Sequence, residues 1–190
     1  MKTHPSHSLA QNNNLQFVQK ALLVILGSIF LTLASYLSIP LPYVPFTLQT
    51  YAVLLIGAFY GPKLGVLTVV TWLTQAALGL PVLADGKMGL LAFVGPTAGY
   101  LFAFPFMAFI TGYALHNKAL QGIKLIYGFM VFSLASALCL TFGGLWLAFL
   151  TTPEIALMNG IIPFVFSSLI KASFATATFA IYSAYKSYNA

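Results

Sequence analysis

Lys171 is the residue whose type and position most clearly indicate chemistry. It lies near the middle of an apolar run from about residue 160 to 185, in a chain that carries eight lysines and two acidic residues. Such a run has the length of a membrane span, and its midpoint lies about 15 Å from either membrane surface. An ammonium buried there costs about 2.5 to 3.5 kcal/mol and requires a partner. That partner is either an anionic ligand or the carbonyls and hydroxyls of neighbouring helices.

Other polar side chains lie within apolar segments and are candidates for the same site. Ser168 precedes Lys171 by three residues, which places both on one helix face. Gln49 and Gln75 are amides in apolar helices, where an unpaired amide costs free energy. Each of these side chains also suits a hydrogen bond between membrane helices, which is the structural alternative. We expect Lys171, Ser168 and the two amides to contribute to a ligand site.

Thr47 and Tyr100 complete the candidate set. Thr47 lies two residues before Gln49 and also suits the role of a helix cap. Tyr100 supplies a flat apolar ring that can form a wall of a binding site, or can pack in the core. The candidate ligand-binding residues are therefore Lys171, Ser168, Gln49, Thr47, Tyr100 and Gln75.

Composition indicates a protein that crosses the lipid bilayer several times. Hydrophobic residues make up 60% of the chain and the mean hydropathy is +0.94. No soluble core tolerates so little charged surface. The net charge of +6 is carried by lysines scattered singly between apolar segments, which membrane topology explains better than a nucleic-acid partner. We therefore expect no nucleic acid binding.

Six apolar segments predict six transmembrane helices in an all-α integral membrane protein. They form one domain over residues 17–186, after a polar tail at 1–16 that we expect to be disordered in the cytoplasm. The second and third segments are joined by a tight connection at Gly61-Pro62-Lys63. The predicted spans are 17–37, 46–60, 64–80, 95–115, 122–150 and 160–186.

The distribution of charge predicts the orientation of these helices. With six spans, six lysines fall on one face of the membrane, which the positive-inside rule makes cytoplasmic. Asp85, Lys87 and Glu154 fall on the opposite face. Both termini are therefore predicted to be cytoplasmic. The six lysines are Lys2, Lys20, Lys63, Lys118, Lys124 and Lys186.

Two connections on the outer face are unusual for simple turns. Residues 39–45 (IPLPYVP) are rich in proline, which favours a stiff extended segment suited to a lid or wall. Residues 79–96 are apolar and glycine-rich, and non-helical apolar backbone must be covered by protein or line a cavity. We expect the second connection to fold over the helix bundle.

Nothing in the chain indicates an enzyme, a metal site or a cofactor. There is no G-x-x-x-x-G-K-[ST] phosphate loop, so ATP cannot be hydrolysed by such a motif in this chain. His116 and Cys139 each stand apart from other metal ligands. No nucleophile can be assigned a neighbouring base.

Several short strings, in order along nearly the whole chain, resemble the BioY family, the biotin-binding S components of energy-coupling factor (ECF) transporters. Each glycine- and proline-rich string alone is weak, but together they are specific. The strings are 40–50 (PLPYVPFTLQT), 61–65 (GPKLG), 79–82 (GLPV), 95–100 (GPTAGY), and Pro163 and Phe164 followed by Lys171.

The resemblance implies an S-component fold in a bacterial plasma (inner) membrane. Such a subunit captures biotin from the outer face and topples in the membrane to release it. It works with a transmembrane coupling subunit and a pair of cytoplasmic ATPases. Biotin suits the candidate residues, since its carboxylate is an anion for Lys171 and its ureido group needs donors and acceptors such as Gln49 or Ser168.

The chain departs from the family at one informative place. Family members usually have Gly-Asp where this chain has Ser167 and Ser168, so a carboxylate three residues before the lysine is missing. Two alternatives therefore stay open beside biotin uptake. One is an S component for a related carboxylate-bearing molecule, and the other is a structural or assembly membrane protein without a ligand.

Overall fold

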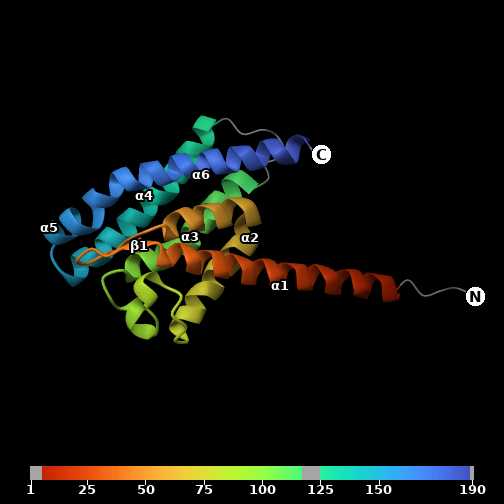
Figure 1. The fold of residues 1–190 in the computed structure, drawn as a ribbon, viewed down its shortest axis with the longest axis horizontal. Coiled ribbons are helices and arrows are strands. Elements are labelled where there is room, and N and C mark those ends of the chain that lie inside the picture. The colour runs from red at the N-terminus through yellow and green to blue at the C-terminus, as the bar shows by residue number, and fades with distance from the viewer. Residues whose placement is uncertain (1–5, 117–124, 189–190) are drawn as a thin grey trace, which may run out of the picture.

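The computed structural model describes residues 6–116 and 125–188, which form a helical bundle with one small hairpin (Figure 1). The described residues do not include three of the lysines on which the predicted orientation depends, namely Lys2, Lys118 and Lys124. The elements in chain order are α1 (Ser6–Tyr36), β1 (Ser38–Ile39), β2 (Phe46–Thr47), α2 (Gln49–Ala77), the 3-10 helices η1 (Ala84–Gly86) and η2 (Leu90–Phe93), α3 (Ala98–Leu115), α4 (Leu125–Leu150), α5 (Pro153–Ala156), the π-helical turn η4 (Leu157–Ile161) and α6 (Ile162–Tyr188).

The predicted all-α membrane fold is confirmed, with five helices in the described part long and apolar enough to cross a membrane. Four of the predicted spans each correspond to one such helix. The predicted spans 46–60 and 64–80 instead lie in one element, α2. The five helices are Leu15–Tyr36, Gln49–Ala77, Ala98–Leu115, Leu125–Leu150 and Pro153–Tyr188.

Helix α2 changes direction sharply at Gly61 and Pro62. Gly61 has φ 81° and ψ 175°, a backbone conformation that only glycine adopts readily. A Cβ placed on Gly65 would lie 3.1 Å from the Cα of Gly57, although eight residues of straight helix span about 12 Å. The two arms of α2 therefore fold back on each other at the predicted tight connection.

Glycines allow the central helices to approach closely. Gly57 on α2 lies against the backbone of Ala108 on α3, and Gly112 on α3 lies against the bend at Gly61 and Pro62. Gly99 on α3 similarly lies against Trp146 on α4. Small residues at such contacts let membrane helices pack by van der Waals attraction, where lipid removes most of the hydrophobic driving force. Helix α3 is consequently held between α2 and α4.

Helix α1 packs mainly against α2 and extends beyond the rest of the bundle (Figure 1). It begins at Ser6, which differs from the disordered tail predicted for residues 1–16. Residues 6–16 contain no proline or glycine, so the apolar helix can continue into this polar stretch as far as Pro5. The start of α1 and the end of α6 lie at one end of the molecule, and the β1–β2 hairpin and α5 lie at the other.

The segment between α2 and α3 folds over the bundle, as expected. Its buried residues Leu83 and Ala84 face inward. Trp72 Nε1 donates to the Val82 carbonyl at 3.2 Å, and Tyr36 Oη donates to the Pro81 carbonyl at 2.6 Å. The segment, residues 78–97, is referred to below as the cover segment.

The β1–β2 hairpin lies beside this cover segment. Ser38 pairs with Thr47 in the antiparallel register of its two strands. Ser38 Oγ also donates to Asp85 Oδ1 at 2.6 Å, which ties the hairpin to η1. The hairpin and the cover segment together close one end of the bundle.

Gly57→Ala should destabilise the protein, because the added methyl would meet the backbone of Ala108, which cannot move away without separating α2 from α3. Overpacking of this kind costs about 1 to 3 kcal/mol. Thermal unfolding in detergent measures the effect. Gly95→Ala is the matched control, since its methyl would meet only the Leu91 carbonyl at 3.4 Å. Equal unfolding temperatures for the two variants would contradict the proposed packing.

Candidate functional site

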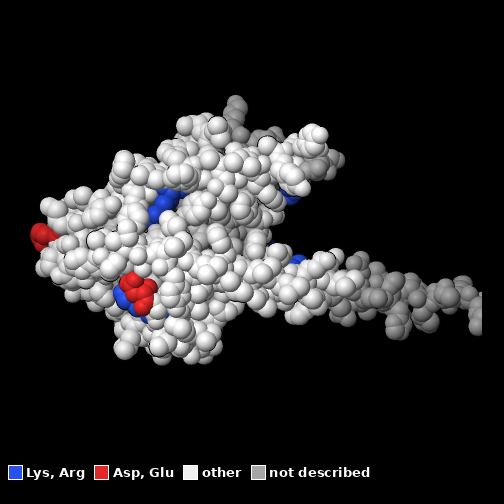
Figure 2. Space-filling model, in the orientation of Figure 1, with Lys and Arg blue, Asp and Glu red and all other residues white. Residues whose placement is uncertain are grey.

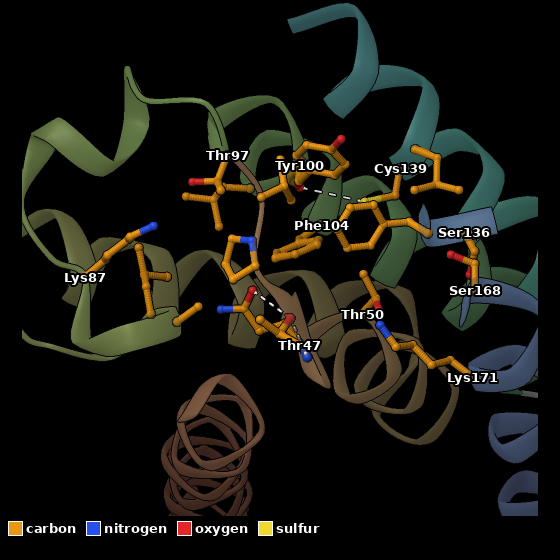
Figure 3. Close-up of a pocket in the computed structure, with 18 residues that line it drawn as sticks. Thr47, Thr50, Lys87, Thr97, Tyr100, Phe104, Ser136, Cys139, Ser168 and Lys171 are labelled. Atoms are coloured by element: carbon orange, nitrogen blue, oxygen red, sulfur yellow. Dashed lines mark hydrogen bonds between the residues drawn. The ribbon is translucent and has the colours of Figure 1, made fainter. Parts of the chain in front are cut away.

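A cavity lies between the β1–β2 hairpin, the cover segment and helices α2, α3, α4 and α6. Its empty volume is about 690 Å³, a figure that includes space open to the surface. Apolar walls come from Val44, Leu83, Leu101, Phe104 and Phe164. Polar side chains enter from several elements, as Figure 3 shows.

Lys171 lies in the wall that α6 contributes to this cavity. The side chain is only 7% exposed. Its Nζ donates to Thr50 Oγ1 at 3.2 Å and lies 4.5 Å from the centre of the Phe46 ring. An ammonium has three donors, and among the described residues one hydroxyl accepts from it. The cation is therefore partly satisfied and keeps capacity for a ligand.

The cavity contains positive charge without a neutralising carboxylate. The chain has two acidic residues, Asp85 and Glu154, and both are exposed and absent from the cavity wall. Lys87 also lines the cavity and is exposed, so it lies near the opening. Figure 3 draws Lys87 and Lys171 on opposite sides of the cavity. The lining is thus suited to an anion of moderate length.

The protein surface contrasts with this concentration of charge. Figure 2 shows a face that is mostly uncharged, as contact with lipid requires, with a blue side chain in a hollow, a red and blue group below it and a red side chain at the left edge. Large exposed apolar residues are numerous on the helices, including Phe106, Leu134 and Phe174. The hydrophobic exterior is consistent with contact to lipid.

Thr47 and Gln49 line the cavity and also stabilise the start of α2. The backbone N–H of Gln49 donates to Thr47 Oγ1 at 3.3 Å, although the residue at the N-cap position of α2 is Leu48. Gln49 Nε2 donates to Ser35 Oγ at 3.0 Å, which ties the cavity wall to α1. The structure therefore places both residues at the cavity wall, where they hydrogen-bond to each other and to α1.

Tyr100 lines the cavity with its ring, and its hydroxyl is already engaged. The Oη donates to the Gly160 carbonyl at 2.7 Å, in the π-helical turn before α6. Its ring lies directly against Gly143 of α4, where a larger residue would displace it. Tyr100 thereby joins α3, α4 and the start of α6 behind the cavity. Ser168 lines the cavity on the same helix as Lys171.

Gln75 is the one candidate that the structure does not place at the cavity. Its Oε1 accepts from Ser28 Oγ at 2.5 Å, and the residue is absent from the cavity wall. The physical reason is that Gln75 lies on the second arm of α2, where its side chain faces α1. It is a hydrogen-bonding contact between two helices.

Sequence reasoning missed several residues of this site. Thr50 and Phe46 contact Lys171, and Ser136 and Cys139 line the cavity from α4. Thr50 directly follows Gln49 in the sequence, and this position identifies it as a further polar candidate for the site. Lys87 was assigned to the outer face only, although it belongs to the segment expected to cover the bundle. No periodicity identified Ser136, because α4 is apolar on all its faces.

Comparison with known proteins relates this arrangement to a family. The sequence model of the BioY family matches residues 4–187. The chain is 35% identical over 156 residues to biotin transporter BioY2 of Lactococcus lactis subsp. cremoris, covering 81% of this chain and 84% of the relative. It is 37% identical over 150 residues to biotin transporter BioY of Thermotoga maritima, covering 74% and 82%.

A solved structure has the same fold. It is a crystal structure of the S-component for biotin from an ECF-type ABC transporter, with a TM-score of 0.74 and 28% sequence identity. The match covers 88% of this chain and 92% of that chain.

Proposed function

The chain belongs to the BioY family, and from this premise we propose that it is the substrate-binding membrane subunit for biotin uptake. Relatives of similar length are named biotin transporters, and the structural neighbour is an S-component for biotin. The proposed subunit takes the vitamin from the outer face and is not an enzyme.

The observation that carries the proposal is the buried ammonium of Lys171 in a cavity without a carboxylate. Biotin offers a carboxylate for a cation, a ureido group for hydroxyls and amides, and an apolar ring and chain for the aromatic wall. The proposed ligand residues are Lys171, Ser168, Gln49, Thr47 and Tyr100, together with Thr50 and Lys87. A cavity with a lysine on either side accepts an anionic group at one of them and a neutral polar group at the other.

The proposed topology has six spans, with the two arms of α2 crossing the membrane separately. Lys20, Lys63 and Lys186 then lie on the cytoplasmic face, and Asp85 and Glu154 lie outside. This arrangement puts the cover segment and the hairpin at the outer face, where the vitamin arrives. Residues 17–186 form the single membrane domain, with both termini in the cytoplasm of a bacterial inner membrane.

Energy for uptake is proposed to come from partner subunits. The chain has no phosphate loop of the G-x-x-x-x-G-K-[ST] type. The family resemblance supports a transmembrane coupling subunit and a cytoplasmic ATPase pair, with toppling of the bundle releasing the vitamin inward.

Lys171→Met should weaken biotin retention, because it removes the cation while keeping a long apolar side chain. Membrane vesicles from cells without their own biotin transporter would be incubated with radiolabelled biotin. We expect vesicles with the wild type to retain label and those with Lys171→Met to lose at least about tenfold in affinity, as a charged hydrogen bond is worth about 1.5 to 3 kcal/mol.

Lys63→Met is the matched control, since Lys63 is exposed and does not line the cavity. It should retain biotin like the wild type. Unchanged retention by Lys171→Met, or a wild type without retention, would contradict the proposed function.

The topology is tested by labelling single cysteines in a Cys139→Ser background. A membrane-impermeant maleimide should label Glu154→Cys on intact spheroplasts, because Glu154 lies outside. Lys63→Cys should be labelled only after the membrane is permeabilised. The reverse pattern, or labelling of both from outside, would be inconsistent with the proposed orientation.

A further inference from the structure

Ser136 on α4 has a buried hydroxyl without a partner. The residue is 4% exposed, and its Oγ makes no hydrogen bond within the part of the chain that the structure describes. A buried polar group in this state is rare and unfavourable unless something else satisfies it. The hydroxyl therefore needs a partner that the described residues do not supply.

Many helical hydroxyls elsewhere in this protein bond to their own helix, whereas Ser133, Ser136 and Ser167 have buried hydroxyls without a partner among the described residues. Thr68 donates to the Leu64 carbonyl at 2.8 Å, and Thr176 donates to the Ala172 carbonyl at 2.7 Å. Thr111 makes the same bond to the Met107 carbonyl at 2.9 Å. This bond to the carbonyl four residues earlier is the usual way for a hydroxyl to be satisfied within a helix. Ser136 does not use it.

Ser136 is also part of the cavity wall. It enters from α4, while Ser168 and Lys171 enter from α6. Figure 3 draws it on the side of the cavity away from Lys87. An unpaired and nearly inaccessible hydroxyl at the wall of the cavity is positioned to bond a molecule that binds there.

We propose that Ser136 determines ligand specificity by hydrogen-bonding the neutral polar group of the bound molecule, a cyclic urea or amide. A hydroxyl both donates and accepts, so it can serve an N–H or a C=O of such a group, whereas a carboxylate offers only acceptors. In biotin this group is the ureido ring. This inference rests on the proposed function, and it adds a residue of α4 that sequence reasoning did not identify.

Ser133 provides an internal comparison. It lies three residues before Ser136 on the same helix, and its Oγ is likewise buried without a partner among the described residues. It does not line the cavity. Ser133 and Ser136 therefore share chemistry and helix, and differ in access to the ligand.

The test is equilibrium binding of biotin to purified wild type, Ser136→Ala and Ser133→Ala in detergent. Ser136→Ala should weaken binding about five- to tenfold, as expected for a lost hydrogen bond to a ligand. Ser133→Ala should bind within about twofold of the wild type, because surface or non-contacting substitutions change free energies by only a few tenths of a kcal/mol and Ser133 does not line the cavity. The loss caused by Ser136→Ala should be equal for biotin and biotin methyl ester, which share the ureido ring.

Thermal unfolding without ligand separates this role from a structural one. Ser136→Ala should unfold at the same temperature as the wild type or higher, because it removes an unsatisfied buried hydroxyl. A lower unfolding temperature with unchanged biotin affinity would assign Ser136 to packing and overturn the proposal. Equal losses in Ser133→Ala and Ser136→Ala would also overturn it, as would a loss confined to biotin and absent with the ester. A wild type that binds no biotin would overturn both this inference and the proposed function.

Discussion

The arrangement of this protein depends on one buried cation. Lys171 is held by the Thr50 hydroxyl at the start of α2 and by the Phe46 ring in the hairpin. Placing an ammonium at mid-membrane costs about 2.5 to 3.5 kcal/mol. A desolvated cation–π contact offsets about 2 kcal/mol of this, and a hydrogen bond to a charged group about 1.5 to 3 kcal/mol. These contacts bring the buried cation close to energetic balance, and the proposed anionic ligand would stabilise it further.

Three parts of the fold keep that cation accessible to a small molecule and shielded from lipid. The reversal of α2 at Gly61 brings its two arms together, and glycine contacts hold α3 against both α2 and α4. Tyr100 reaches across to the Gly160 carbonyl and supports the back of the cavity. The cover segment and the hairpin are tied by Ser38 and Asp85 and close the remaining side. Loss of any of these contacts would expose the Lys171 ammonium to lipid. The stability of the fold and the integrity of the cavity therefore depend on the same contacts.

The sequence predicted the features that follow from composition and strong local signals. Lys171 was identifiable because a charge is rare in an apolar run, and the cover segment because apolar glycine-rich backbone cannot face lipid. Gly61 and Pro62 predicted the reversal. The start of α1 was missed because a polar stretch without breakers does not end a helix. The sequence could not show that Ser136 lines the cavity and that Gln75 does not. Tertiary packing decides which neighbour each face of an apolar helix meets.

The central claim is that a cavity with lysines and no carboxylate selects an anionic ligand, and calorimetric titration with biotin and biotin methyl ester tests it most directly. The two molecules share ring, chain and ureido group, and differ in the charge that the lysines are proposed to bind. Biotin should bind the purified protein at least about tenfold more tightly than its methyl ester. This is the difference expected from one charge-assisted hydrogen bond to the carboxylate. Equal affinities for the acid and the ester would contradict the account, because the lysines that line the cavity would then have no part in holding the carboxylate.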